Sequence, residues 1–319
     1  MRRREIIIGT RGSELALWQA TFVKLELQGI FPDLSFELKI VKTTGDEIVD
    51  VALAKIDDTG LFTRQIENEL IAGIIDLAVH SLKDLQSEQP EGLTIGAVCR
   101  RELPNDALVS SEFSSISNLP IGAKVATGSL RRKSQLLHFR PDLEVVDIRG
   151  NVPTRIKKYD ASDLEGIILA FAGLRRLTLE GRVSEIISPD LMLPAVGQGA
   201  VAIEVREADA EILEIVKRID HSETRMCVDA ERAFLRRLEG GCKVPIGALA
   251  TLREDTIELQ GMVGELDGST VIRDTVLGPY RSPEAIGVNL AEKLIRKGAG
   301  RLLNKVRREI ENSPVSTML

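Results

Sequence analysis

Short apolar runs and helically spaced apolar residues alternate along the first hundred positions of this chain. The runs are bounded by polar residues and glycine, which is typical of short buried strands. Between the first two runs, Leu15, Trp18, Phe22 and Leu25 recur at the spacing that places them on one face of a helix. The pattern predicts strands over residues 6–8, 36–41 and 76–79, and helices over residues 14–27 and 61–74.

The alternation restarts after a polar, proline-containing stretch at residues 100–106, which we interpret as a crossing between two lobes. A glycine-rich stretch at residues 193–200 leads into another apolar run, and we interpret it as the return crossing. Two such crossings imply lobes joined by a paired hinge, the arrangement of a ligand clamp. The pattern here predicts strands over 93–98, 107–109, 124–126, 144–148, 166–169 and 200–205, and helices over 130–139, 154–159 and 172–177.

The last hundred residues predict a third, smaller α/β unit. Its helices are expected over 221–238, 283–296 and 301–310, and its strands over 247–252, 257–263 and 270–276. Because 319 residues exceed what one core usually supports, several domains are expected. We predict an α/β protein of three domains: a first lobe of residues 1–100 with 198–219, a second lobe of residues 101–197, and a C-terminal domain of residues 220–319.

The composition excludes several classes of protein. Hydrophobic residues make up 43% of the chain and charged residues 28%, the balance of an ordinary globular protein. Aromatic residues make up only 3% and the net charge is −6, which argues against a nucleic-acid partner. No apolar stretch reaches membrane-spanning length, and the run after Arg2-Arg3-Arg4 is too short for a signal peptide. We therefore expect a cytoplasmic protein with neither a membrane nor a nucleic-acid partner.

One of the three cysteines stands out by its surroundings. Cys99, Cys227 and Cys242 are odd in number and lack CxxC or Cys/His spacing, so we expect neither a disulfide framework nor a metal site. Cys242 follows two glycines and precedes Pro245, in a loop that presents a thiol rather than packing it. The adjacent Lys243 favours the thiolate. The alternative is that Cys242 is a small apolar filler at a domain edge.

The turn after the first predicted strand is a candidate anion site. Ser13 is a natural N-cap for the helix over residues 14–27, and such a helix start leaves backbone N–H groups free for an anion. Arg11 lies beside them in the sequence. The alternative interpretation is simple capping beside a solvated arginine.

The strand predicted over residues 76–79 leads directly into Lys83 and Asp84. The carboxyl ends of strands in open α/β sheets are where ligands bind, so we interpret both as site residues. An acid there can stabilise a cation or exchange a proton. The alternative is an exposed ion pair at a strand end. We interpret His80 as a structural residue satisfied by the backbone.

Basic residues gather between positions 131 and 176, although the chain as a whole is acidic. They are Arg131, Arg132, Lys133, Arg140, Arg149, Arg155, Lys157, Lys158, Arg175 and Arg176. Thr127 and Ser129 can donate hydrogen bonds to an anion at the same strand ends, and arginines supply forked donors for carboxylates. Gln198 of the return crossing can face this cleft. The pattern predicts a small polyanionic ligand, with solvated surface arginines as the alternative.

Seven motifs of the chain resemble, in order and spacing, those of the porphobilinogen deaminase family, also called the hydroxymethylbilane synthases. They are residues 10–20, His80-Ser-Leu-Lys-Asp84, Ser129-Leu-Arg-Arg132, Ile148-Arg-Gly-Asn-Val152, and residues 169–174, 193–200 and 238–247. The resemblance runs from about residue 5 to residue 300. It implies two lobes similar to periplasmic binding proteins and a third domain whose Cys242 carries a dipyrromethane cofactor through a thioether.

The resemblance also implies an activity. The family joins four porphobilinogen molecules head to tail onto the cofactor, with loss of ammonia, and then releases hydroxymethylbilane by hydrolysis in tetrapyrrole and heme biosynthesis. Asp84 matches the catalytic acid, which stabilises positive charge on a pyrrole nitrogen. Cofactor binding falls on Cys242, Lys83, Asp84, Ser129, Arg131 and Arg132, and substrate binding on Arg11, Ser13, Gln19, Lys55, Thr127, Arg149, Arg155, Arg176 and Gln198. A monomer is expected.

The chain departs from the family pattern at three places. Ala126-Thr-Gly128 stands where Gly-Thr-Ser is common, which removes one hydroxyl from the anion site. Asp57-Asp-Thr59 replaces a more typical Gly-Gly-Lys, so we expect a stiffer and more acidic loop over the cleft. Gln86 replaces a common proline. None of these changes touches Asp84 or Cys242, so we expect activity to survive.

Two other classes of protein share part of this pattern. A two-lobed small-anion binding protein without catalysis has the same clamp, but it normally carries an export signal and has no use for the third unit or the presented cysteine. An effector-sensing regulator needs a basic DNA-binding module, and the sequence displays none.

Overall fold

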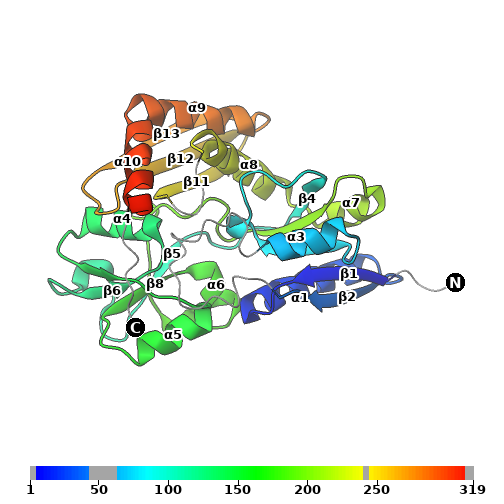
Figure 1. The fold of residues 1–319 in the computed structure, drawn as a ribbon, viewed down its shortest axis with the longest axis horizontal. Helices are drawn as coiled ribbons and strands as arrows, with labels where there is room; N and C mark the ends of the chain where they lie inside the picture. The colour runs from blue at the N-terminus through cyan, green and yellow to red at the C-terminus, as the bar shows by residue number, and fades with distance from the viewer. Residues whose placement is uncertain (1–4, 43–62, 240–243, 313–319) are drawn as a thin grey trace.

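Three sheets organise the part of the chain that the structure, a computed structural model, describes, which is residues 5–42, 63–239 and 244–312. Two five-stranded sheets form a first and a second lobe, and a three-stranded sheet forms a third unit. In Figure 1 the third unit lies above the two lobes. The α/β class, the two lobes and the smaller C-terminal unit confirm the fold expected from the sequence.

The first lobe is a sheet with the strand order β2-β1-β3-β10-β4. Its strands are β1 (Glu5–Thr10), β2 (Ser35–Ile40), β3 (Leu77–Ser81), β4 (Leu93–Val98) and β10 (Val201–Arg206), and its helices are α1 (Glu14–Ile30), α3 (Arg64–Ile71) and α7 (Ala210–Val216). Strands β1, β2 and β3 are parallel, whereas β10 runs antiparallel between β3 and β4. The return of the chain to the first sheet is therefore confirmed.

Helices cover both faces of this sheet, as its nearly continuous apolar strands require. Val23 of α1 and Ile212 of α7 pack with Ile203 in the core on one face. Ile66 of α3 packs with Ala78 on the other face. Both faces of β3 are therefore buried, and the strand leads into the polar segment after residue 81 with little freedom to move.

The second lobe repeats this plan with the strand order β7-β6-β8-β5-β9. Its strands are β5 (Asp106–Val109), β6 (Lys124–Ala126), β7 (Glu144–Val146), β8 (Gly166–Ala170) and β9 (Val183–Ile186), and its helices are α4 (Leu130–Phe139), α5 (Val152–Asp160) and α6 (Phe171–Arg176). Strands β6, β7 and β8 are parallel, so their carboxyl ends lie along one edge. That shared edge is where the sequence analysis places most of the arginines.

The two connections between the lobes run side by side. The backbone N–H of Cys99 donates to the carbonyl of Val201 at 2.9 Å, and that of Glu102 donates to Gly199 at 3.1 Å. A paired crossing was expected from the polar stretch at 100–106 and the glycine-rich stretch at 193–200. The hydrogen bonds join the two crossings along their length, so the lobes are linked by a double connection.

The third unit is an antiparallel sheet covered by helices. Its strands are β11 (Ile246–Arg253), β12 (Thr256–Gly264) and β13 (Val271–Pro279), and its helices are α8 (Ser222–Arg237), α9 (Pro283–Arg296) and α10 (Ala299–Asn312). Phe234 of α8, Leu290 of α9 and Leu259 of β12 share its core. Among the helices of the described residues, none combines the length and apolarity needed to cross a bilayer.

Glu231 of α8 lies where all three units meet, and it is fully buried. Its carboxylate accepts hydrogen bonds from Arg101 Nη1 at 2.5 Å and from the backbone N–H groups of Gly197 and Ala250, each at 2.8 Å. Arg101 and Gly197 belong to the two crossings, and Ala250 lies on β11. One carboxylate thus ties the third unit to both connections between the lobes.

Two elements of the fold were not predicted from the sequence. Strand β9 is a short edge strand whose residues are half-buried or exposed, so it lacks the apolar run that marked the others. Helix α7 is short, and its start is fixed by Asp209, whose side chain accepts a hydrogen bond from the N–H of Ile212. Neither was predicted, because β9 has no apolar run and α7, at seven residues, is too short to display a clear helical period.

Candidate active site between the two lobes

A short 3₁₀ helix, Leu82–Asp84, places Lys83 and Asp84 at the carboxyl end of β3. The buried side chain of Leu82 anchors this turn, and its N–H donates to the carbonyl of Ala200 at 3.0 Å. Asp84 is exposed. The position is the one the sequence predicts, with an accessible carboxylate held on a fixed turn.

The surroundings of Lys83 lower the pKa of its ammonium group. Burial of the ammonium group lowers the pKa of Lys83 to about 8, with a further lowering from Arg132, and Asp84 opposes the change. Its Nζ lies 3.3 Å from Oε1 of Gln198. Gln198 therefore connects the return crossing to the turn Leu82–Asp84. It is buried and does not line either of the two cavities at this edge.

The first of two cavities at this edge brings together four residues predicted for the site: Arg11, Ser13, Gln19 and Asp84. Ser13 Oγ accepts a hydrogen bond from the N–H of Ala16 at 3.3 Å, so the serine does cap α1. Gln19 Nε2 donates to Ser81 Oγ at 2.8 Å. Capping and a place in the cavity coexist at Ser13, because the cap uses one lone pair of the hydroxyl.

The second cavity adjoins the first, since Leu15 and Ser81 line both. It brings together four further cations predicted for the site: Lys83, Arg132, Arg155 and Arg176. Burial lowers the pKa of Arg155 to about 10, and Arg132 and Arg149 lower it further. Cations that repel one another in a partly buried cavity favour an anionic ligand that carries several carboxylates.

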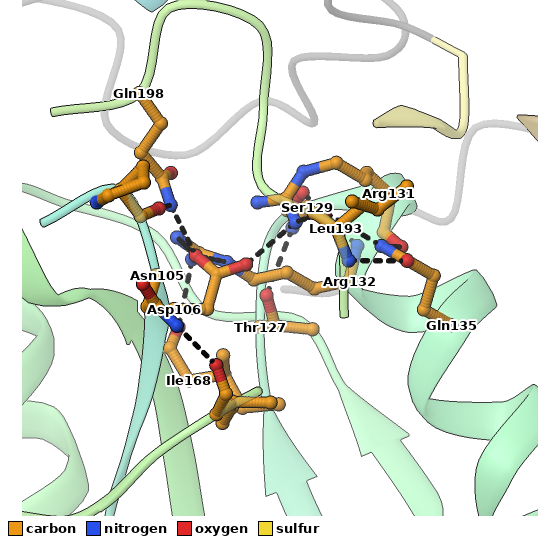
Figure 2. A network of polar contacts seen from close by, with 12 residues as sticks. Asn105, Asp106, Thr127, Ser129, Arg131, Arg132, Gln135, Ile168, Leu193 and Gln198 are labelled. Atoms are coloured by element: carbon orange, nitrogen blue, oxygen red, sulfur yellow. Dashed lines mark hydrogen bonds and ion pairs between the residues drawn. The ribbon is translucent and has the colours of Figure 1, made fainter. Parts of the chain in front are cut away.

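The carboxylate of Asp106, at the first position of β5, lies between two arginines of α4 (Figure 2). Its Oδ2 accepts from Arg131 Nη1 at 2.6 Å, and its Oδ1 accepts from Arg132 Nε at 3.0 Å and Nη2 at 2.8 Å. Burial alone would raise the pKa of Asp106, but the charges of Arg131 and Arg132 outweigh burial and hold the pKa well below its usual range. Asp106 is therefore a permanent anion inside the second lobe.

Asp106 was not among the residues predicted for the site. Its pairing with Arg131 and Arg132 shows that both arginines have a partner inside the second lobe. Arg131 is buried, and its Nη1 also donates to the carbonyl of Leu193 at 2.6 Å. Arg131 is not among the residues that line the two cavities, whereas Arg132 lines the second. An acid at the start of an otherwise apolar strand was the available indication that the two arginines had an internal partner.

The hydroxyls of the loop after β6 bond to their own backbone. Thr127 Oγ1 accepts from the N–H of Ser129 at 3.3 Å, and Ser129 Oγ caps α4 by accepting from the N–H of Arg132 at 3.4 Å. Figure 2 shows Thr127 and Ser129 beside Arg132. Both hydroxyls thus lie near the arginines, and each retains its own proton as a donor.

The space around residue 128 in the same loop favours glycine. A Cβ built on Gly128 would lie 2.8 Å from the carbonyl oxygen of Ile148, a backbone atom that cannot move away cheaply. A glycine at this position therefore lets two loops of the sheet edge approach closely.

Arg149 and Arg176 complete the cationic edge. Arg149 Nε donates to Asp147 Oδ2 at 2.9 Å, while its buried Nη1 has no hydrogen-bond partner among the described residues. Arg176 Nη2 donates to the carbonyl of Gly199 at 2.7 Å. An orphaned guanidinium nitrogen is costly to bury, and a ligand carboxylate would satisfy it.

Two expectations about charged residues were wrong in detail. His80 is not satisfied by the backbone: its Nε2 faces the fully buried carboxylate of Glu204 at 3.3 Å. Arg140, counted with the anion-binding cluster, donates to the carbonyl of Ile116 at 2.9 Å and pairs with Asp142 at 2.6 Å. Its role is to close a turn of the second lobe, so the basic cluster overstates the size of the binding surface.

Other predicted features lie outside the described residues: Lys55, Cys242 and the segment 57–59. Across the described part of the chain, no group of three or more His, Cys, Asp or Glu side chains is placed to hold a metal ion. The described residues of this region include an exposed carboxylate, Asp84, with Lys83 and several arginines around the two cavities.

Comparisons with known proteins bear on this site. The family model described as "Porphobilinogen deaminase, dipyromethane cofactor binding domain" matches residues 6–214, and that of the "Porphobilinogen deaminase, C-terminal domain" matches residues 225–296. A porphobilinogen deaminase from Carboxydothermus hydrogenoformans is 49% identical over 307 residues, covering 96% of this chain and 99% of the relative. One from Moorella thermoacetica is 52% identical over 303 residues, covering 95% and 97%.

Solved structures align with about two thirds of the chain. A putative methionine-binding lipoprotein from Bacillus subtilis has 11% identity and a TM-score of 0.41, covering 67% of this chain and 89% of its own. A nutrient binding protein from Burkholderia cenocepacia, bound to methionine, has 15% identity and a TM-score of 0.43, covering 66% and 89%. At these values the likeness indicates nothing about the ligand of this chain.

Proposed function

This chain belongs to the porphobilinogen deaminase family, and we propose that its active site is the pair of adjoining cavities at the carboxyl end of β3, with Asp84 as the catalytic carboxylate. The activity is the stepwise condensation of four porphobilinogen molecules, with loss of ammonia, onto a dipyrromethane primer, followed by hydrolytic release of hydroxymethylbilane. The observation that supports this location best is that Lys83, next to Asp84 at the end of β3 in the first lobe, lines the same cavity as Arg132 of the second lobe.

The residues present fit a dipyrromethane, whose rings carry acetate and propionate side chains. Lys83 and Arg132 border the second cavity, and the buried Nη1 of Arg149 has no acceptor among the described residues. We propose that Lys83, Asp84, Ser129, Arg131 and Arg132 hold the cofactor and that Cys242 attaches it. When bound, the cofactor would supply the nucleophilic carbon to which the first pyrrole is joined.

Asp84 acts on the substrate as ammonia leaves. Positive charge then develops on the pyrrole nitrogen, and a carboxylate fixed beside that nitrogen stabilises the charge more strongly than mobile water does. The anchored turn Leu82–Asp84 supplies the fixed position, and the exposure of Asp84 makes the carboxylate accessible to substrate. The carboxylate of Asp84 is also placed to accept the proton lost from the attacking carbon.

The remaining cations bind the acidic arms of the substrate. Forked guanidinium donors match carboxylates in a bidentate way, which fixes the ring orientation as well as its charge. We assign this role to Arg11, Arg149, Arg155 and Arg176, with Ser13, Gln19, Lys55, Thr127 and Gln198 as polar partners. We further propose that the protein acts as a monomer in the cytoplasm, with porphobilinogen as its only small-molecule partner.

Intact mass and substrate consumption test the assignment together. The purified chain should be heavier than its sequence by two pyrrole units, should give colour with an acidic aldehyde reagent for linked pyrroles, and should consume porphobilinogen. A two-lobed binding protein without catalysis should weigh what its sequence states and should leave porphobilinogen unchanged. That second result would remove both the cofactor and the activity from this chain.

A further inference from the structure

We propose that Asp106 is a positioning residue for the condensation reaction, which fixes the guanidinium groups of Arg131 and Arg132 and, through Gln198, the ammonium group of Lys83. Asp106 lines neither of the two cavities and belongs to none of the seven motifs. The inference rests on the proposed function, because Asp106 acts only through residues assigned to that site.

The first step of the inference is the use of both carboxylate oxygens. Arg131 and Arg132 are consecutive on α4, so their like charges repel, and each has many rotamers of similar energy. Asp106 Oδ2 accepts from Arg131 and Oδ1 accepts twice from Arg132, which selects one rotamer for each. Asp106 is fully buried, so these protein donors, and not bulk water, are the partners of its carboxylate.

The second step is the orientation of the Gln198 amide (Figure 2). Its Nε2 donates to Asp106 Oδ1 at 2.9 Å and to the carbonyl of Pro104 at 2.6 Å. Both partners only accept hydrogen bonds, so the amide nitrogen must face them and the amide oxygen must face the other way. The oxygen then lies 3.3 Å from Lys83 Nζ, which can only donate. The carboxylate of Asp106 therefore fixes the direction of both hydrogen bonds, from Gln198 to Asp106 and from Lys83 to Gln198.

The third step is electrostatic. Burial lowers the pKa of Lys83 to about 8; Asp84 and Asp106 raise it, whereas Arg132 and Arg131 lower it. The negative charge of Asp106 therefore offsets the two arginines that it binds. Without that charge, Lys83 would lose its proton at a lower pH, although Asp106 lies in the other lobe.

A purely structural role for Asp106 makes a different prediction. A buried ion pair that only stabilises the second lobe would, when removed, lower the melting temperature and leave the behaviour of the folded enzyme unchanged. Positioning instead predicts a change in KM and in the pH dependence of the folded enzyme. These two readouts separate the explanations.

The experiment compares the full-length enzyme, loaded with its own cofactor, with three variants: Asp106→Asn, Asp106→Glu and Gln198→Met. The readouts are kcat, KM for porphobilinogen, the alkaline limb of kcat/KM and the melting temperature. The matched control is Asp142→Asn, because Asp142 pairs with Arg140 at the other end of α4, at 2.6 Å, away from the cavities. The control should keep the wild-type KM and pH limb.

Asp106→Asn should raise KM about tenfold, as loss of charge-assisted bonds to two arginines implies. The alkaline limb of kcat/KM of this variant should move to lower pH by about half a unit. The shift should be smaller than that from loss of a charge in direct contact with Lys83. Asp106→Glu retains the charge but not the geometry, so it should raise KM and keep the limb. Gln198→Met removes the acceptor of Lys83, so it should lower the limb.

Each outcome decides for or against Asp106. A folded Asp106→Asn enzyme with wild-type KM and pH limb would overturn the proposal. If Asp106→Asn does not fold, the other two variants decide, and wild-type KM and limb in both would overturn it. A wild-type chain that carries no cofactor and consumes no porphobilinogen would instead refute the proposed function.

Discussion

The guanidinium carbon of Arg176 lies 5.6 Å from the centre of the Trp18 indole ring. Arg176 ends α6 in the second lobe, and Trp18 lies on α1 in the first, where its ring stacks on that of Phe22. A cation above an aromatic ring is attracted by the negative face of the ring's quadrupole. The contact therefore bridges the two lobes beside the cavity that Arg176 lines.

Trp18 is the only tryptophan of the chain, so its fluorescence reports on this contact. Arg176→Gln should shift the emission to longer wavelength, because the indole loses its cover and meets more water. The neighbouring Arg175→Gln, which removes only an ion pair with Glu102, is the matched control and should leave the spectrum unchanged. Identical spectra for wild type and Arg176→Gln would show that the lobes do not meet here in solution.

The pKa of about 8 for Lys83 predicts an alkaline loss of activity. Below that pH the ammonium group is charged and can bind carboxylates, and above it the group is neutral. The value of kcat/KM should therefore fall about tenfold for each unit above the pKa. Lys83→Arg, whose guanidinium keeps its charge, should move the limb to higher pH. A limb that stays in place in Lys83→Arg would assign it to another group.

Asp84→Asn should nearly abolish turnover while leaving the fold intact. The amide has a shape similar to that of the carboxylate but carries no charge for the developing cation, and removal of such a stabiliser costs about 10²–10³-fold in kcat. Because Asp84 is exposed, the melting temperature should hardly change. Single-turnover assays measure the chemical step directly, and near-normal rates would remove Asp84 from the mechanism.

Cys242→Ser should remove the excess mass of two pyrrole units. The thiols of Cys99 and Cys227 are free and buried, and burial raises the pKa of Cys99 to about 12 and of Cys227 to about 11, so neither forms the thiolate needed for attachment. Cys99→Ser and Cys227→Ser are therefore controls that should keep the extra mass. Retention of the mass in Cys242→Ser would move the attachment elsewhere.

Local patterns of apolar residues predicted much of the fold, because buried residues recur periodically within each helix and strand. The limits predicted for α4 and α9 agree with the structure, and Ser13 caps α1 as expected. Residues 200–205 were assigned back to the first sheet from an apolar run after a glycine-rich loop, and β10 confirms this. Short edge elements such as β9 escaped, since their side chains are half-exposed and show no period.

Partners distant in sequence could not be read from such patterns. Arg131 and Arg132 were predicted as ligand-binding residues, and strand order also places Asp106 of β5 against them across β8. The close backbone approach at Gly128 and the carboxylate facing His80 have the same origin. Side-chain types predicted a carboxylate-binding site, and the arrangement of the sheets brings Lys83, Arg132, Arg155 and Arg176 together in one cavity.

The position of β10 has a consequence for synthesis on the ribosome. Every strand of the second lobe comes from residues 106–186, so that lobe emerges as an uninterrupted segment able to assemble by itself. The first lobe begins earlier but lacks an inner strand until residues 201–206 have been made, and until then β3 and β4 have unpaired edges. The nascent chain can therefore complete the sheet of its later-encoded lobe before that of the earlier one, and the turn that carries Asp84 gains its hydrogen bond to Ala200 only after the second lobe has been made.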